Sequence, residues 1–165
     1  MNELELKHLA PYLPYGLSFS VNLNDVRDNF PNELRTLKLA EISIDLALKI
    51  GKPILRPLSS ITKEEASKLL SKAQGVSVNE DTLRVLNNNN DTIIIQYEYL
   101  NDVLLCLSLS YTNRTFIATP YAIYGSHKRI TPTPMFIYDW FIENHFDVFG
   151  LIDRGLAIEK ITLNK

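Results

Sequence analysis

The sequence predicts an α+β fold, in which an antiparallel sheet is covered by one mid-chain helix and by helices near the C-terminus. Runs of alternating apolar and polar residues between positions 93 and 119 are joined by short polar turns, which is typical of an antiparallel meander. A capped helical pattern precedes these runs at 62–75, and a strongly apolar segment follows Pro134. A length of 165 residues suits one compact domain, so we expect residues 1–165 to form a single domain.

The N-terminal part of the chain predicts a short helical turn followed by extended segments. The turn should end at Ala10–Pro11, because two nearby prolines remove backbone donors and restrict the residues before them. Apolar residues at 17, 19, 21 and 23 then predict a half-buried strand. The alternation continues over 34–50 but changes phase, so we expect strands with a bulge or turn near Ala40–Glu41. Residues 51–57 should be extended, since two prolines exclude helix there.

The mid-chain helix has clear start and stop signals. Thr62 and Glu65 form a capping box, in which the hydroxyl and the carboxylate each accept a hydrogen bond from the other residue's backbone amide. Apolar residues recur at helical spacing from Ala66 to Ala73, and Gly75 is a natural C-terminal stop.

The strands after this helix are expected to be joined by tight turns, and the chain is expected to become irregular after Pro120. The predicted turns lie at Asn87–Asn90, Asn101–Asp102 and Asn113–Arg114.

The last third predicts a buried helix and an aromatic packing centre. From Phe136 to Phe141 only Asp139 is polar, so a helix starting near Pro134 should be buried on most sides. Gly150 and Gly155 should allow tight turns around a further short helix. The expected packing centre consists of Trp140, Phe141, Phe146, Phe149 and Leu151.

Bulk composition excludes several classes of protein. A formal net charge of −2 disfavours a broad basic face, so nucleic acid is an unlikely partner. The single cysteine, Cys106, forms neither an intrachain disulfide nor a thiolate zinc site, and it reads as a packing residue within a strand. The start lacks a secretion signal, and no apolar run suits a membrane span. We therefore expect a soluble cytoplasmic protein that needs no cofactor.

Three segments carry a resemblance to a known family: LAPYLPYGL at 9–17, KPILRPLS at 52–59 and HFDVFGLIDRGLAI at 145–158. The chain resembles a family of short, uncharacterised proteins encoded by phages and prophages of Bacteroidetes. The resemblance implies a location in the cytoplasm of a bacterial host and a phage or host protein as partner. It implies no catalytic, cofactor-binding or metal-binding residue.

His145 and Asp147 are the leading candidates for a metal or catalytic site. A histidine close to a carboxylate can supply two metal ligands or an oriented base, and Asp139, which shares a helical face with Glu143, could add a third ligand. The simpler interpretation is that Asp147 caps a short helix beginning at Val148, while His145 ends the preceding helix. We favour the capping interpretation.

Two further groups could contact a partner. The basic run containing Lys128 and Arg129 lies near two tyrosines and could hold single-stranded nucleic acid, although an exposed loop is the simpler interpretation. Tyr12, Tyr15 and Trp140 could anchor a protein partner, since aromatic residues dominate interface energies.

No nucleophile elbow, phosphate-binding loop or paired-cysteine motif occurs in the sequence. The sequence therefore favours a non-catalytic accessory or protein-interaction function. The alternatives are a small metal-assisted hydrolase using His145 and Asp147, and a weak nucleic-acid binder using Lys128 and Arg129.

Overall fold

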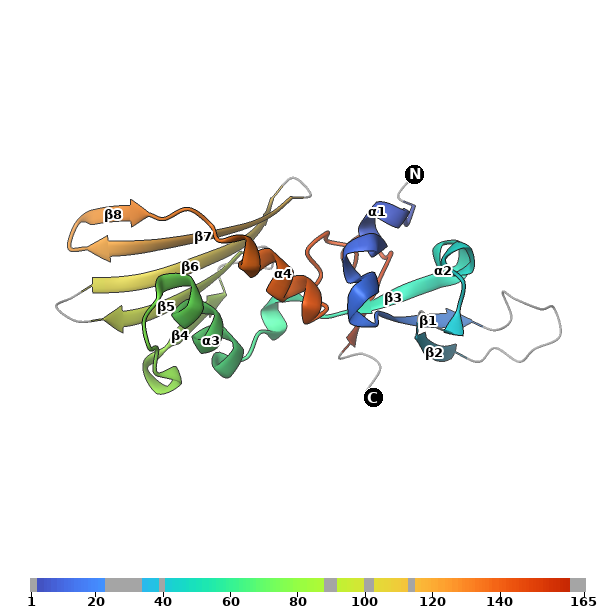
Figure 1. Ribbon diagram of the computed structural model, residues 1–165, viewed down its shortest axis with the longest axis horizontal. Helices are drawn as coiled ribbons and strands as arrows, with labels where there is room; N and C mark the ends of the chain where they lie inside the picture. Colours follow the sequence, from blue (N-terminus) through green and yellow to red (C-terminus); the bar gives the residue numbers. More distant parts are fainter. Residues whose placement is uncertain are drawn as a thin grey trace. The chain divides into compact units, whose positions relative to one another are not determined.

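The structure is a computed structural model that describes residues 3–22, 34–38, 41–87, 92–99, 103–112 and 115–160. Two compact units emerge, shown in the ribbon of Figure 1. The terminal unit combines Met1–Pro57 with Phe141–Lys165, and the central unit is Leu58–Trp140. The expectation of a single domain stays a prediction, and each unit is described by itself.

The central unit contains the predicted antiparallel meander. Its five strands follow one another in the order β4-β5-β6-β7-β8, and each neighbouring pair is antiparallel. Together with the helices this arrangement confirms the α+β prediction. The turns predicted at Asn87–Asn90, Asn101–Asp102 and Asn113–Arg114 lie wholly or partly outside the described residues. The strands are β4 (Arg84–Asn87), β5 (Thr92–Tyr99), β6 (Val103–Thr112), β7 (Thr115–Tyr124) and β8 (His127–Ile130).

One face of this sheet is covered by helix α3 (Lys63–Gln74). The register pairs Ile93 with Leu109 and Ile95 with Leu107, so these apolar side chains share a face and are buried on it. The capping box of α3 forms as predicted: the Glu65 amide donates to Thr62 Oγ1 (3.2 Å) and the Thr62 amide to Glu65 Oε2 (2.9 Å). Short 3₁₀ helices η4 (Leu58–Ser60) and η5 (Glu80–Thr82) flank α3.

The prediction of an irregular segment after Pro120 is wrong. Strand β7 runs through this proline and forms a hairpin with β8 across Gly125–Ser126, where Gly125 has a φ of 57°. A glycine with positive φ at the first turn position suits a two-residue hairpin. Pro120 is tolerated because only one hydrogen bond of its pair with Thr131 is lost. Its carbonyl accepts the Thr131 amide at 3.0 Å, and the missing bond is the one that a backbone amide at position 120 would donate to the Thr131 carbonyl.

Helix α4 (Met135–Glu143) begins just after Pro134, as predicted, but is not buried on most sides. Ile137 is fully buried, whereas Met135 is 82% exposed. The first turns of α4 contact the central unit through Phe136, which lies under Lys72 Nζ at 4.5 Å, and through Tyr138, whose ring is 6.3 Å from that of Phe116.

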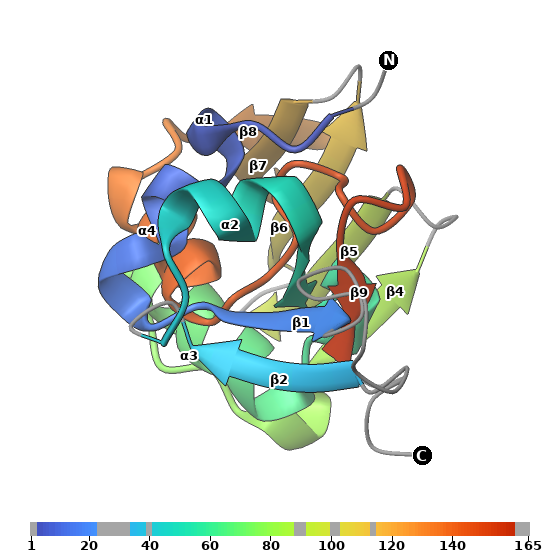
Figure 2. The ribbon, with the colours of Figure 1, turned by 90° about the vertical axis from the view of Figure 1, so that its right-hand side faces the viewer.

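The terminal unit contains a smaller sheet with the strand order β2-β1-β3-β9, of which β1, β2 and β9 are labelled in Figure 2. Strand β1 is paired antiparallel to β2 and β3, and β3 is parallel to β9. The α-helical turn α1 (Leu6–Leu9) ends near Ala10 as predicted, but the extended segment expected after it is absent at first, because the chain stays helical through both prolines in the 3₁₀ helix η1 (Ala10–Tyr15). The strands are β1 (Ser18–Asn22), β2 (Leu34–Lys38), β3 (Gly51–Leu55) and β9 (Ile158–Glu159).

Two details of this unit differ from the sequence prediction. The centre of strand β1 is buried on both faces, because Ser20 is buried like Phe19 and Val21, whereas Ser18 and Asn22 at its ends are half-buried. Residues 44–50 form helix α2 (Ile44–Ile50) instead of a strand; Ala40 and Leu23 lie outside the described residues. Ser43 caps α2 by accepting the Leu46 amide at 3.3 Å, a local signal that outweighs the period-two pattern.

Candidate functional site

The segments 9–17, 52–57 and 145–158 meet in the terminal unit. The Tyr12 hydroxyl donates to the carbonyl of Phe146 at 2.6 Å and accepts the Val148 amide at 3.3 Å. Arg56, just past β3, pairs with the same segment, since its amide donates to the His145 carbonyl and its carbonyl accepts the Asp147 amide, both at 2.8 Å. These contacts show that the three segments are hydrogen-bonded to one another within this unit.

Asp147 is the centre of this junction. It is 7% exposed, and its carboxylate accepts backbone amides from Phe149 (3.3 Å), Leu151 (2.9 Å) and Ile152 (2.8 Å). Burial raises the pKa of this carboxyl, against the opposing effect of the three amides. Asp147 therefore caps the following segment as predicted, but that segment is a series of turns in place of the expected helix. Glycines with positive φ at Gly150 and Gly155 interrupt any helical continuation.

His145 binds the N-terminal segment. Its backbone has a φ of 57°, which is uncommon for a residue other than glycine, and its Nε2 lies 2.9 Å from the carbonyl oxygen of Tyr15. A carbonyl only accepts, so Nε2 carries the proton and donates. The ring thus satisfies a carbonyl at the end of η1, and not one of α4, the helix that precedes His145.

His145 Nε2 and both carboxylate oxygens of Asp147 are consequently bonded to the backbone. Asp139, proposed as a third ligand, belongs to the central unit. Within the described ranges, no group of three His, Cys, Asp or Glu side chains is arranged to hold a metal ion. The geometry supports the capping interpretation, and it offers the metal-assisted hydrolase no converging ligands among these residues.

The histidines of the terminal unit predict a stability that falls in acid. Burial lowers the pKa of both His8 and His145 below the ordinary value of 6.5. As the pH falls from 7, the histidines of the unfolded chain take up protons before those of the folded chain. The free energy of unfolding should therefore decrease as the pH falls from 7 toward the folded-state pKa values. Urea unfolding at several pH values measures this slope.

The matched variants separate the two rings. His8 Nδ1 accepts the Glu5 amide at 3.1 Å, so His8→Asn preserves an acceptor, and His145→Gln preserves the donor to Tyr15. Each variant should flatten the pH dependence, and a double variant with an unchanged slope would contradict this assignment.

The three aromatic residues predicted to anchor a partner differ in their exposure to solvent. Tyr12 is completely buried, so its ring is a core residue and is not available to a partner. Tyr15 is 40% exposed, whereas Trp140 is half-buried. Within the expected packing centre, Phe141, Phe146 and Leu151 are fully buried, while Trp140 and Phe149 are not.

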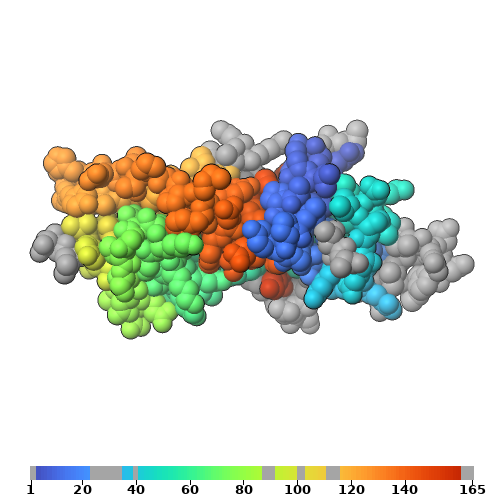
Figure 3. All heavy atoms as spheres, viewed as in Figure 1, coloured from blue at the N-terminus to red at the C-terminus, as the bar shows by residue number. Residues whose placement is uncertain are grey.

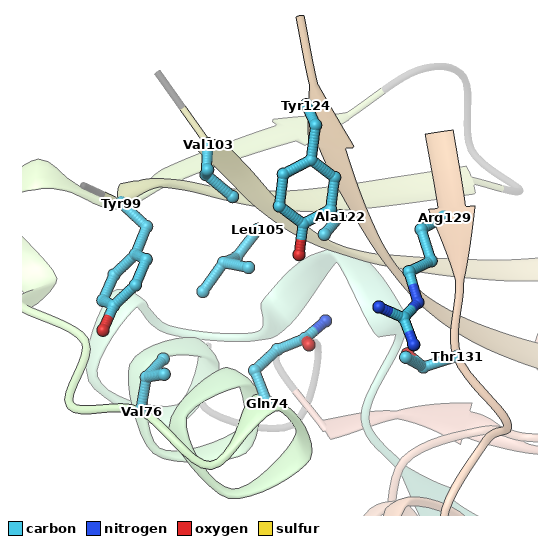
Figure 4. Close-up of a pocket in the computed structure, with 9 residues that line it drawn as sticks. All are labelled: Gln74, Val76, Tyr99, Val103, Leu105, Ala122, Tyr124, Arg129 and Thr131. Atoms are coloured by element: carbon cyan, nitrogen blue, oxygen red, sulfur yellow. The ribbon is translucent and has the colours of Figure 1, made fainter. Parts of the chain in front are cut away.

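A cavity in the central unit is the stronger candidate for binding. It has a volume of about 460 Å³ and opens where α3 ends and leaves the sheet uncovered (Figure 4). Such a volume lies within the range of roughly 300–1,000 Å³ that is usual for ligand pockets. We call it the tyrosine–arginine pocket; its lining residues are Gln74, Val76, Tyr99, Val103, Leu105, Ala122, Tyr124, Arg129 and Thr131.

The pocket combines an apolar floor with a few polar groups. Leu105 and Ala122 form the floor, and the rings of Tyr99 and Tyr124 flank it at 39% and 47% exposure (Figure 4). Arg129 lies at the β8 side, and no carboxylate in the part of the chain that the structure describes pairs with it. The arrangement can hold an apolar group beside an anionic one.

Strand alternation divides the basic run between two faces. Arg129 pairs with Ala122 and faces the pocket, while Lys128 pairs with Ile123 on the opposite face. There Lys128 Nζ lies 3.9 Å from the centre of the Tyr121 ring, and burial together with Cys106 raises the Tyr121 pKa to about 12. Lys128 and Arg129 therefore do not form the single patch proposed for nucleic acid. Cys106 is fully buried, as expected for a packing residue.

The comparisons provide no assignment, since no protein-family model, no curated protein and no solved structure matches the chain. Over the described residues, no helix is both long and apolar enough to cross a membrane.

Sequence reasoning missed the pocket. The sequence prediction did not include strand β8, which supplies Arg129 to the pocket. The Gly125–Ser126 pair between Tyr124 and His127 could have indicated this strand, because such a pair is a recognised hairpin signal.

Proposed function

We propose that the chain is a non-catalytic binding protein that captures a phage or host protein in the tyrosine–arginine pocket. The main support for this proposal is the pocket, in which an apolar floor, two partly exposed tyrosine rings and the Arg129 guanidinium converge. Tyrosine and arginine are the residue types most often found at the energetic centres of protein interfaces.

The proposal assigns different tasks to the two units. In the terminal unit the segments 9–17, 52–57 and 145–158 use their polar groups to hold one another. In the central unit, polar and aromatic groups around the pocket stay accessible. A cytoplasmic location in a bacterial host belongs to the same proposal.

A tagged pull-down from phage-infected or lysogen-carrying Bacteroidetes cells tests this function. We expect the wild-type chain to recover one protein in stoichiometric amount. The double variant Tyr99→Ala/Tyr124→Ala should recover at least about tenfold less of that protein, because removing interface anchors of this kind typically costs that much affinity. Both rings are partly exposed, so their removal should leave the fold intact.

The control is Ile117→Ala, which removes a side chain of similar exposure (44%) from the opposite face of the sheet. This variant should retain the partner. Equal recovery with both variants, or recovery of nucleic acid alone, would contradict the proposed function.

A further inference from the structure

The outer edge of the central sheet has a defined hydrogen-bonding pattern. Strand β8 lies at the end of the strand order, and all four of its residues are exposed. The Thr131 amide donates to Pro120, so this pair is a hydrogen-bonded one. Because such pairs alternate along an antiparallel ladder, Arg129 and His127 bond to β7, while the amides and carbonyls of Lys128 and Ile130 point outward.

This edge adjoins the tyrosine–arginine pocket. Arg129 is directed to the pocket face of the sheet, between the two residues whose backbone groups point outward. A strand added along β8 would place one of its residues directly opposite Arg129, in a pair without hydrogen bonds, where cross-strand side chains approach most closely. The added strand would thus present one side chain to Arg129 at the rim of the pocket.

The charge of the edge selects the chemistry of the added strand. His127, Lys128 and Arg129 are consecutive, and the facing stretch of β7, from Tyr121 to Tyr124, has no carboxylate. A second copy of β8 is a poor occupant, because the antiparallel pairing that uses both outward residues would place Arg129 opposite its equivalent. An acidic side chain at that position would form an ion pair instead.

We infer that the edge of β8 binds an extended acidic segment of the partner by strand addition, with a carboxylate of that segment paired to Arg129. Main-chain hydrogen bonds to Lys128 and Ile130 align the segment, and Arg129 selects its charge. The β7–β8 hairpin reaches the surface of the central unit in the space-filling view (Figure 3). This inference rests on the proposed function and specifies the chemistry of its partner.

A peptide titration tests the inference. The probe is the acetylated and amidated peptide Thr-Val-Thr-Glu-Thr-Val-Thr, and its control carries Lys in place of Glu. Titration into the ¹⁵N-labelled full chain should shift the Lys128 and Ile130 amide resonances first, and the Glu peptide should bind at least about fivefold more tightly than the Lys peptide. No shift with millimolar Glu peptide would overturn the inference.

A pair of variants isolates the backbone contact. Ile130→Pro removes an outward amide that β7 does not use, so the Glu peptide should bind about tenfold more weakly. Ile130→Ala keeps the amide and should bind like the wild type. If the two variants bind equally well, strand addition at β8 is excluded. Arg129→Glu should reverse the preference between the two peptides, and an unchanged preference would exclude the ion pair.

The outcomes also separate this inference from the proposed function. Loss of the cellular partner with Tyr99→Ala/Tyr124→Ala but not with Ile130→Pro would keep the pocket as the binding site and overturn strand addition. Retention of the partner by both variants would overturn both.

Discussion

Phe146→Ala should lower the free energy of unfolding by about 3–5 kcal/mol, as removal of a fully buried aromatic ring usually does. The ring is inaccessible to solvent, lies edge-on to Phe141 with 5.1 Å between the centroids, and has the Arg56 guanidinium carbon 4.2 Å above it. The substitution therefore leaves a cavity and also removes an aromatic pair and a cation–π contact. Urea unfolding followed by circular dichroism measures the change.

Phe146→Leu is the matched control, because it keeps most of the apolar volume and should cost clearly less. Trp140→Ala should also cost less than Phe146→Ala, since Trp140 is half-buried. A Phe146→Ala protein within about 1 kcal/mol of the wild type would show that the three converging segments do not depend on this ring.

Asp147→Ala should destabilise the chain by about 3 kcal/mol, because it leaves the amides of Leu151 and Ile152 without their acceptor, and an unpaired buried polar group costs about 1–3 kcal/mol. The weaker bond from Phe149 is lost as well. The loss should appear both in the unfolding free energy and as faster hydrogen exchange at these amides.

Two substitutions control for charge and position. Asp147→Asn retains one acceptor oxygen but turns a donor toward one of the amides, so its effect should be intermediate. Asp153→Asn changes an exposed carboxylate in the same series of turns and should alter stability by less than about 0.5 kcal/mol. Equal stability of Asp147→Ala and Asp153→Asn would contradict the capping role.

Local signals predicted the parts of the fold that depend on neighbouring residues. The Thr62 capping box, the Gly75 stop and the alternation in β5 and β6 all involve short-range geometry, and the structure confirms them. Predictions failed where two local patterns competed. In residues 44–50 the period-two pattern predicts a strand, but the Ser43 cap begins a helix. Pro120 predicts the end of the regular strand, but a proline only removes a donor and β7 continues through it.

The candidate site was less accessible to sequence reasoning. The capping role of Asp147 could be predicted, because it depends only on the backbone amides that follow in the sequence. The hydrogen bonds that join this segment to Tyr12 and Arg56 could not, because they connect residues far apart in the chain. The tyrosine–arginine pocket depends on where α3 ends above the sheet and on the alternation that separates Arg129 from Lys128. Neither feature is visible before the strand register is known.

The shortness of β8 should limit edge-to-edge pairing between molecules. Strand β8 is four residues long and ends at Ile130, and Pro120 cannot return the hydrogen bond that its carbonyl receives from the Thr131 amide. The open edge of β8 offers the backbone groups of Lys128 and Ile130, too short a template to hold a second sheet through main-chain bonds alone. So short an edge should stay accessible at high protein concentration without templating the growth of fibres.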